Sequence, residues 1–166
     1  NQLLVLIDGV EANDGAQGDE FNWGTLSAAD IERIEIVRGP QSVFGGSDAL
    51  AGVVNIVTRS ASEPFSLDLN AEGGSFGTRQ AGLAAGHRGE RFHLRAGVSD
   101  LQSDGDNVSR EGGEDEGYSN RSYNLKGGLE LAEQLALGFV ARRSDIESDF
   151  DEIDFATGLP ADSDAY

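Results

Sequence analysis

Cysteine and methionine are both absent from this 166-residue chain. Without a thiol, neither a disulfide framework nor thiol chemistry is available, so cysteine usage gives no information on the redox compartment. No apolar run approaches the roughly 20 residues of a membrane-spanning helix, which excludes a helical span within this sequence. The chain starts in the strand-like run NQLLVLIDGV and ends in an acidic segment. We therefore expect an internal fragment, for which the lack of a signal peptide is uninformative.

Basic residues are also scarce. The chain has 12 Lys and Arg against 30 Asp and Glu, a formal net charge of −18. Nucleic-acid binding requires clustered basic residues for the phosphates, so the composition excludes a nucleic-acid partner. An acidic surface of this density is either simply solvated or collects cations, and the solvated alternative is the commoner one. Glycine, at 23 residues, is about twice as frequent as in average proteins.

The central stretch of the chain is Ile31 to Arg59. Two β-branched runs, Ile31–Val37 and Val53–Thr58, flank a glycine-rich middle with a short helical candidate at Ser47–Ala51. The pattern predicts a strand, a tight turn, one helical turn and a second strand. It contains no candidate nucleophile, metal cage or phosphate loop, so we expect no enzymatic activity from it.

A shorter apolar run, Leu3–Ile7, precedes this unit and is closed by Asp8-Gly9, which predicts a strand followed by a turn. Its continuous hydrophobicity favours burial on both faces. The segment from Glu11 to Thr25 has the composition of a loop, and Ala28–Asp30 is predicted to form a short turn capped by Ser27.

The periodicity changes after Arg59. Residues 60–64 read as a linker, and apolar residues then alternate with polar ones in five segments of about ten residues, the length of a tilted membrane-spanning β-strand. These segments are Phe65–Glu72, Thr78–Gly86, Arg91–Val98, Tyr123–Leu131 and Leu135–Ala141. Tight turns are predicted at one end, and long connections at the other, namely Gln102–Arg121 and everything after Asp145. Outer-membrane barrels show this asymmetry.

Two architectures explain the alternation. A soluble antiparallel sandwich is its more frequent source. A wide barrel would instead place the polar rows on a wet lumen and the apolar rows against lipid. The polar rows carry Asp68, Glu72, Arg91, Arg95, Lys126, Glu130 and Arg142. The alternation alone leaves both architectures open.

The motifs of the first 59 residues bear on this choice. VLIDGV (Val5–Val10) followed by IERIEIVRGPQSVFGGSDALAGVVNIVTR (Ile31–Arg59) resembles the C-terminal half of the plug domain of TonB-dependent outer-membrane receptors. Several family motifs occur here at the spacing that the family has, and the segment that follows them has the alternation expected of barrel strands. Gly45 departs from the family pattern, where an aromatic is usual, and Ala51 stands where a second glycine is common.

The resemblance implies a fold class. It is an α+β plug fragment followed by all-β antiparallel transmembrane β-barrel strands, an incomplete and open sheet. Residues 1–59 would be the C-terminal half of the plug, 60–64 the linker, and 65–166 the first five or so strands of a barrel of about 22. The implied location is the bacterial outer membrane, in contact with membrane lipid.

The resemblance also implies a function, active import of a scarce ligand without chemical change. The implied partner is TonB, which would contact a segment upstream of this sequence. The acidic loops that follow this type of plug resemble the cobalamin-transporter branch, so we expect a small-molecule ligand such as cobalamin or a related corrinoid. A ferric siderophore or haem, both metal chelates, is the alternative within the family, and a soluble β-rich binding or adhesion module is the alternative of another class.

The cobalamin branch binds Ca²⁺ in acidic outer loops, and this resemblance suggests calcium here, with no organic cofactor. Calcium takes six to eight oxygen ligands, which two acidic loops could supply together. The alternative is that these loops are merely solvated. The candidate ligands are Asp104, Asp106, Glu114, Asp115, Asp149 and Asp151.

Ligand contacts are predicted in the loop between Ile7 and Ile31, which the resemblance places at the outer apex of the plug. Aromatic and amide side chains suit a large corrinoid or chelate with amide groups. The alternative is that the two aromatics only pack the loop onto the plug. The candidates are Asn13, Gln17, Phe21, Asn22 and Trp23.

Arg38 and Arg59 bound the central unit. Inside a barrel each would need a carboxylate partner, because an unpaired buried charge is costly. We therefore predict plug–barrel ion pairs at these two residues, as part of a latch. The alternative is that each arginine caps carbonyl groups of the adjacent turn.

Overall fold

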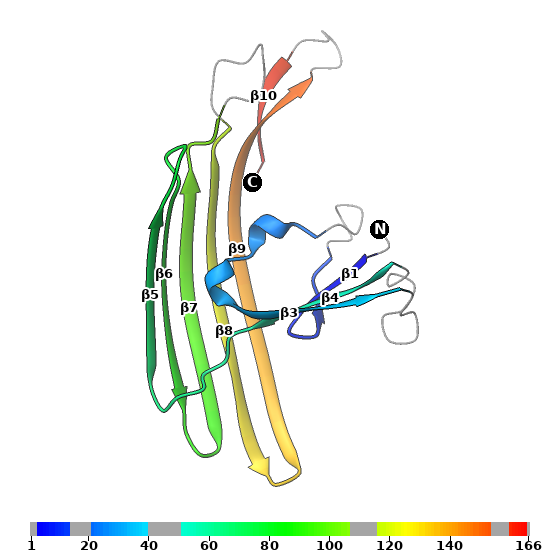
Figure 1. The fold of residues 1–166 in the computed structure, drawn as a ribbon, viewed down its shortest axis with the longest axis vertical. Helices are drawn as coiled ribbons and strands as arrows, with labels where there is room; N and C mark the ends of the chain where they lie inside the picture. The colour runs from blue at the N-terminus through cyan, green and yellow to red at the C-terminus, as the bar shows by residue number, and fades with distance from the viewer. Residues whose placement is uncertain (1–2, 14–20, 40–50, 107–115, 154–159, 166) are drawn as a thin grey trace.

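The computed structural model describes residues 3–13, 21–39, 51–106, 116–153 and 160–165, with side chains as far as residue 148. These residues form two sheets, one of four strands in the order β2-β1-β4-β3 and one of six in the order β10-β9-β8-β7-β6-β5. The larger sheet is curved, and the smaller one projects from its concave side (Figure 1). We call them the wall and the inner sheet. The open, largely antiparallel fold confirms the predicted class.

The inner sheet contains β1 (Leu3–Ile7), β2 (Val10–Glu11), β3 (Ile31–Arg38) and β4 (Gly52–Thr58). β4 lies in the middle, parallel to β1 and antiparallel to β3. This confirms the three strands predicted from the apolar runs. Their β-branched residues build a small core, in which Val5, Val54 and Ile56 pack with Phe21. The predicted helical turn at Ser47–Ala51 lies outside the described residues apart from Ala51.

β2 pairs only with the end of β1, and an amide side chain closes the rest of this edge. Asn13 donates from Nδ2 to the Leu3 carbonyl at 3.0 Å and accepts at Oδ1 from the Val5 N–H at 2.7 Å. The side chain thus takes the place of one peptide group of a neighbouring strand, since a carboxamide offers the same donor and acceptor.

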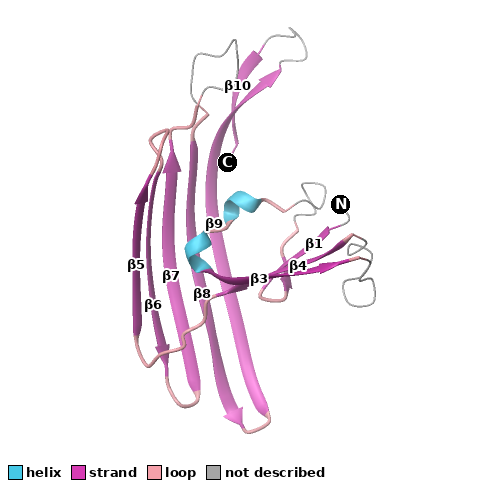
Figure 2. Cartoon of the chain, in the orientation of Figure 1, coloured by secondary structure: helices cyan, strands magenta, loops and turns pink. Residues whose placement is uncertain are grey.

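Two 3-10 turns, η2 (Trp23–Thr25) and η3 (Ala28–Asp30), lie in the connection between β2 and β3 and contact the wall. They are the helical segments visible in Figure 2, where strands dominate the described chain. Asn22 caps η2 by accepting from the Gly24 N–H. Ser27 precedes η3 as predicted, but its side chain makes no capping hydrogen bond. Gln80 Nε2 of the wall instead donates to it at 3.3 Å.

The wall contains every strand predicted from the alternation. They are β5 (Ser66–Gly73), β6 (Arg79–Arg88), β7 (Phe92–Ser103), β8 (Tyr118–Ala132) and β9 (Leu135–Ile153). Each strand pairs antiparallel with the next. The long connections lie at one end of the sheet and the tight turns β6–β7 and β8–β9 at the other (Figure 1), which confirms the predicted asymmetry.

The prediction of five strands followed by a long connection after Asp145 was wrong. β9 continues to Ile153, and a sixth strand, β10 (Pro160–Ala165), pairs with it from Pro160↔Ile153 to Ala165↔Ser148. The acidic composition of this region disguised the strands, because Asp and Glu have low β-propensity. Ladder hydrogen bonds do not depend on side-chain type, so the hairpin continues beyond the apolar part of the wall.

The wall has its polarity inverted relative to a soluble protein. Large apolar side chains on the convex face are exposed, including Leu69 at 73% and Leu137 at 57%, whereas polar residues on the concave face are buried, including Arg95 at 6% and Ser122 at 2%. A soluble sandwich requires the reverse, because it buries its apolar rows. This observation favours a lipid-facing wall over the sandwich. Among the described residues, no helix is long and apolar enough to cross a membrane.

The apolar band on the convex face ends at one row of the ladder. Asp100, Arg121 and Asp145 are successive cross-strand partners, and Arg121 forms an ion pair with Asp100 at 2.7 Å. The next row toward the tight turns contains Val98 and Tyr123, with Arg143 beside them on β9. On β7 and β8, the change from charged to apolar side chains places the outer boundary of the band between these two rows.

Candidate functional site: the contact between the inner sheet and the wall

The inner sheet is held against the wall mainly by one strand. Alternate residues of β8 face the concave side, and each of five successive ones bonds to the inner sheet or its connections. We call these residues the docking strip: Tyr118, Asn120, Ser122, Asn124 and Lys126. The period of two along a strand is what brings all five to the same side.

The upper part of the docking strip binds backbone carbonyls of η2. Tyr118 Oη donates to the Gly24 carbonyl at 2.7 Å, and Asn120 Nδ2 donates to the same oxygen. The Thr25 carbonyl accepts from Arg142 and from two wall hydroxyls, those of Ser122 at 3.4 Å and Ser144 at 3.3 Å. Because the acceptors are main-chain atoms, these bonds fix the position of η2 whatever its side chains are.

The middle of the docking strip holds a carboxylate. Asn124 Nδ2 donates to Asp30 Oδ2 at 2.7 Å. Burial raises the pKa of Asp30, opposed by the nearby guanidinium groups of Arg142, Arg95 and Arg59 and by the Asn124 hydrogen bond. Arg95, on β7, forms an ion pair with Asp68 of β5 at 2.7 Å. The middle of the interface is therefore a group of opposite charges in which Arg95 is buried and Asp68 is exposed.

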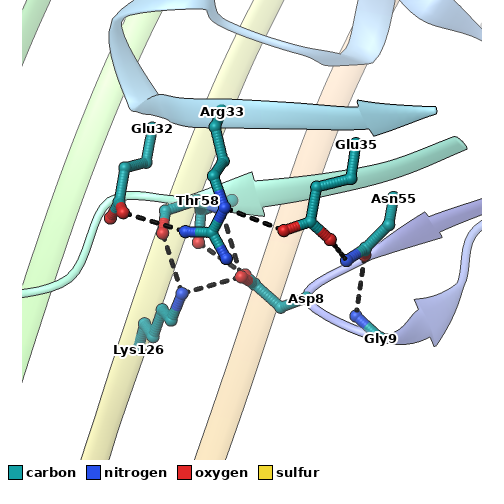
Figure 3. A network of polar contacts seen from close by, with 8 residues as sticks. All are labelled: Asp8, Gly9, Glu32, Arg33, Glu35, Asn55, Thr58 and Lys126. Carbon is teal, nitrogen blue, oxygen red and sulfur yellow. Dashed lines mark hydrogen bonds and ion pairs between the residues drawn. The ribbon is translucent and has the colours of Figure 1, made fainter.

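The lower end of the docking strip carries an ion pair between the two sheets. Lys126 Nζ lies 2.7 Å from Asp8 Oδ1 and donates to the Thr58 carbonyl at 2.8 Å. The Asp8 carboxylate also accepts from the Thr58 N–H at 3.0 Å and from its hydroxyl. The exposures of the two charged side chains are 5% for Asp8 and 19% for Lys126. Three segments meet here, the β1–β2 turn, the end of β4 and β8 (Figure 3).

The polar contacts continue from this corner across the inner sheet (Figure 3). The Gly9 N–H donates to Asn55 Oδ1 at 3.3 Å, and Asn55 Nδ2 donates to Glu35 at 2.9 Å. Glu35 and Glu32 both pair with Arg33. The Asn55 hydrogen bond, together with Arg33, lowers the pKa of Glu35. These outer groups are exposed, so their ion pairs contribute little to stability.

The predicted ligand contacts occupy different environments. Phe21 is buried in the core, and its ring meets that of Trp23 edge-on at 4.9 Å. Trp23 is 53% exposed, whereas Asn22 caps η2 and Asn13 closes the edge of β1. Gln17 lies outside the described residues. Among the described candidates, Trp23 is therefore the exposed aromatic side chain, and the Phe21 ring supports it.

Arg38 and Arg59 are both exposed in the described chain. The Arg59 guanidinium lies close enough to Asp30 to lower the pKa of that carboxyl group. The backbone N–H of Arg59 donates to the Asp30 carbonyl at 2.9 Å. An ion pair between these arginines and the rest of a barrel stays a prediction. The ion pair that the structure does contain, between Asp8 and Lys126, was missed. One signal was available, because Lys126 is the only lysine in the sequence and lies on the predicted lumen face.

The calcium candidates fall mostly beyond the described side chains. Glu114 and Asp115 are outside the described residues, and nothing is described of the side chains of Asp149 and Asp151. The Asp104 carboxylate packs against Gly77, in the space that a Cβ on this glycine would occupy. Within the described part of the chain, no group of three or more His, Asp or Glu residues is arranged to hold a metal ion. Calcium binding stays a prediction.

Comparison with known proteins identifies the family. Residues 1–53 match the TonB-dependent Receptor Plug Domain. Over 153 residues the chain is 31% identical to the vitamin B12 transporter BtuB of Photobacterium profundum, covering 90% of this chain and 25% of that protein. The chain belongs to the TonB-dependent receptors. The inner sheet, with its connections, is thus a receptor plug and the wall is part of a receptor barrel of the bacterial outer membrane, as the sequence predicted.

Other known proteins are similar over part of the chain or in fold. The iron-regulated outer membrane virulence protein of Vibrio cholerae is 41% identical over 73 residues, which cover 40% of this chain and 11% of that protein. The copper transporter OprC superposes with a TM-score of 0.70 at 19% identity, over 89% of this chain and 23% of that one. The siderophore receptor PirA of Acinetobacter baumannii gives 0.68 at 19% identity, over 89% and 24%.

These matches differ in what they support. The structural ones are too distant in sequence to show more than the fold. The chain spans a quarter or less of the length of the curated relatives named here.

Proposed function

We propose that the receptor containing this chain imports a scarce ligand across the outer membrane, driven by TonB, and leaves the ligand chemically unchanged. The observation that carries the proposal is the inverted polarity of the wall, whose buried concave face is occupied by the plug. A barrel closed by a plug needs an energised rearrangement before a large solute can pass. TonB would supply the energy through a segment upstream of the described strands.

We propose cobalamin or a related corrinoid as the ligand. Support comes from the vitamin B12 transporters of Photobacterium profundum, at 31% identity over 90% of the chain, and Vibrio vulnificus, at 37% over 51%. A ferric siderophore is the second candidate, favoured by the iron-regulated relative.

Trp23 is the residue that we propose as a ligand contact. Its indole is exposed, while the adjacent Gly24 and Thr25 carbonyls are tied to the wall and Phe21 supports its ring. A rigid aromatic surface loses little conformational entropy when a large, partly apolar ligand covers it.

Binding and uptake by cells that carry the complete receptor test these proposals. We expect uptake of labelled cobalamin that disappears when TonB is deleted, and we expect Trp23→Ala to weaken cobalamin binding by about tenfold, the equivalent of one good aromatic contact. Val10→Ala is the matched control, because Val10 is an exposed apolar residue of the plug on the β1–β2 corner, at 63% against 53% for Trp23. Uptake of a ferric siderophore but not of cobalamin would transfer the proposal to the second ligand. TonB-independent uptake, or none of either ligand, would refute the import function.

A further inference from the structure

Three cavities follow one another along the contact between plug and wall. One of about 230 Å³ lies between Asp30, Arg59 and the wall residues Asp68, Asn70, Arg95 and Ser99. A small one of about 20 Å³, enough for about one water molecule, shares Asp30, Arg59 and Arg95 with it. The third, of about 720 Å³, extends toward the tight β8–β9 turn and is lined by Gly9, Gly128, Glu130 and Ala136 among others.

The Asp8–Lys126 ion pair stands between the second and third cavities, since both residues line both of them. The turns at the lower end of the sheet correspond to the periplasmic end of a barrel. Parting Asp8 from Lys126 would therefore connect the middle of the interface with the cavity that leads toward the periplasm.

The bonds on the two sides of this partition differ in kind. Above it, η2 accepts five hydrogen bonds at its Gly24 and Thr25 carbonyls, from donors on the neighbouring strands β8 and β9. η3 is held by the bond from Asn124 to the Asp30 carboxylate. Below it, the β1–β2 corner is held to the wall by Lys126. Among the residues that the structure describes, separating η2 from the wall requires several hydrogen bonds to break at once, whereas separating the corner requires only the bonds of the Lys126 side chain to break.

The ion pair also has the energetics of a reversible contact. The attraction in a buried pair is largely offset by the desolvation of its two charges, so the intact pair holds only moderately. A separated pair is costly only while its charges stay dry. Here the large cavity lies directly beside both side chains, and water entering from it would solvate them as they part.

We propose that the plug opens at this corner. Asp8 and Lys126 part during transport and join the cavities into a passage along β8 and β9, while η2 and η3 remain bound to the wall. Lys126 is a positioning residue in this scheme and does not touch the bound ligand. The inference rests on the proposed import function, and it specifies which part of the plug moves.

Crosslinking in the complete receptor tests the proposal. The described chain has no cysteine, so pairs can be introduced at chosen places. A short thiol-reactive bridge between the residues of an Asp8→Cys, Lys126→Cys variant should leave ligand binding unchanged and reduce uptake by about tenfold or more, since the corner can no longer part from the wall. A cleavable bridge should restore uptake on reduction. The matched control is Thr25→Cys with Ser144→Cys, which bridges η2 to β9 and should leave uptake intact.

A second variant does not depend on bridge formation. Lys126→Met keeps the length of the side chain but removes its charge, and we expect TonB-independent entry of a small hydrophilic dye to rise by about tenfold, because the partition loses its ion pair. Lys126→Arg should restore the barrier. Asn120→Ala, which removes a bond to η2, should not raise dye entry.

Every outcome of the crosslinking bears on the proposal. Loss of uptake with both bridges would mean that the plug leaves the wall as a whole, and retained uptake with the Asp8–Lys126 bridge would mean that this corner does not open. Either result overturns the inference, as does unchanged dye entry in Lys126→Met. The unmodified receptor, measured alongside, keeps these results separate from a failure of the import function, which would show as absent or TonB-independent ligand uptake.

Discussion

At the scale of single residues, the plug contains positions whose backbone geometry or close neighbours favour one kind of residue. Asp8 is one of them, because it adopts a φ of 51° in the β1–β2 turn and its carboxylate accepts bonds from Thr58 and Lys126. Asp is among the few non-glycine residues that tolerate this backbone region. The residue is therefore suited both to the turn and to the ion pair.

Gly52 is a second such position and gives a prediction. A Cβ at Gly52 would lie 2.6 Å from the Val37 carbonyl oxygen on the neighbouring strand, a backbone atom that cannot rotate away. We expect Gly52→Ala to destabilise the plug by about 1–3 kcal/mol through this overlap. Hydrogen exchange of the β3 and β4 amides in the complete receptor measures it. Gly138→Ala is the control, since its nearest neighbouring atom lies 4.0 Å away, and equal protection in the two variants would contradict the prediction.

At the scale of elements, β8 combines two surfaces on one strand. Its convex residues are apolar as far as Tyr123, and its concave residues form the docking strip. The alternation of the sequence was enough to predict this strand and its two faces. It was not enough to predict its length, because the convex positions become charged or polar at Arg121 and Ser119 while the ladder with β7 continues.

The partners across the interface could not be predicted in the same way. Asp8 and Lys126 are separated by 118 residues in sequence, and the contact depends on the register of every strand between β5 and β8. A periodic pattern gives the face of a residue but not its neighbour on another sheet. The arginines chosen for an ion pair were conspicuous in the motif, whereas Lys126 could be recognised only by its rarity.

The two faces of the wall give a prediction about substitutions. Leu125 is a convex residue within the apolar band, and Leu125→Lys should lower the free energy of unfolding by about 2–4 kcal/mol if it lies near the middle of the bilayer. Glu72→Lys introduces the same group on the concave side and should change it by less than about 0.5 kcal/mol. Urea unfolding in lipid vesicles compares the two. Similar losses in both variants would mean that the convex face does not contact lipid.

At the scale of the whole molecule, two features of the described chain promote association in aqueous buffer without detergent. The convex face of the wall exposes apolar residues over five strands, and β5 has no neighbour on its outer side. An exposed apolar surface of this extent drives association. An unpaired strand edge provides the template for it. The net charge of −18 opposes association only weakly at physiological salt, because repulsion between exposed charges is screened.

We therefore expect the isolated 166-residue chain to associate into large species in detergent-free buffer and to disperse in a mild detergent that covers the convex face. Sedimentation velocity at equal protein concentration, with and without detergent, measures the difference. Leu69→Ser with Leu137→Ser is an informative variant, since it removes two of the most exposed leucines and should reduce association without touching the concave face. A chain that stays monomeric in plain buffer would contradict this prediction, because its apolar rows would then have to be kept away from water within a single chain.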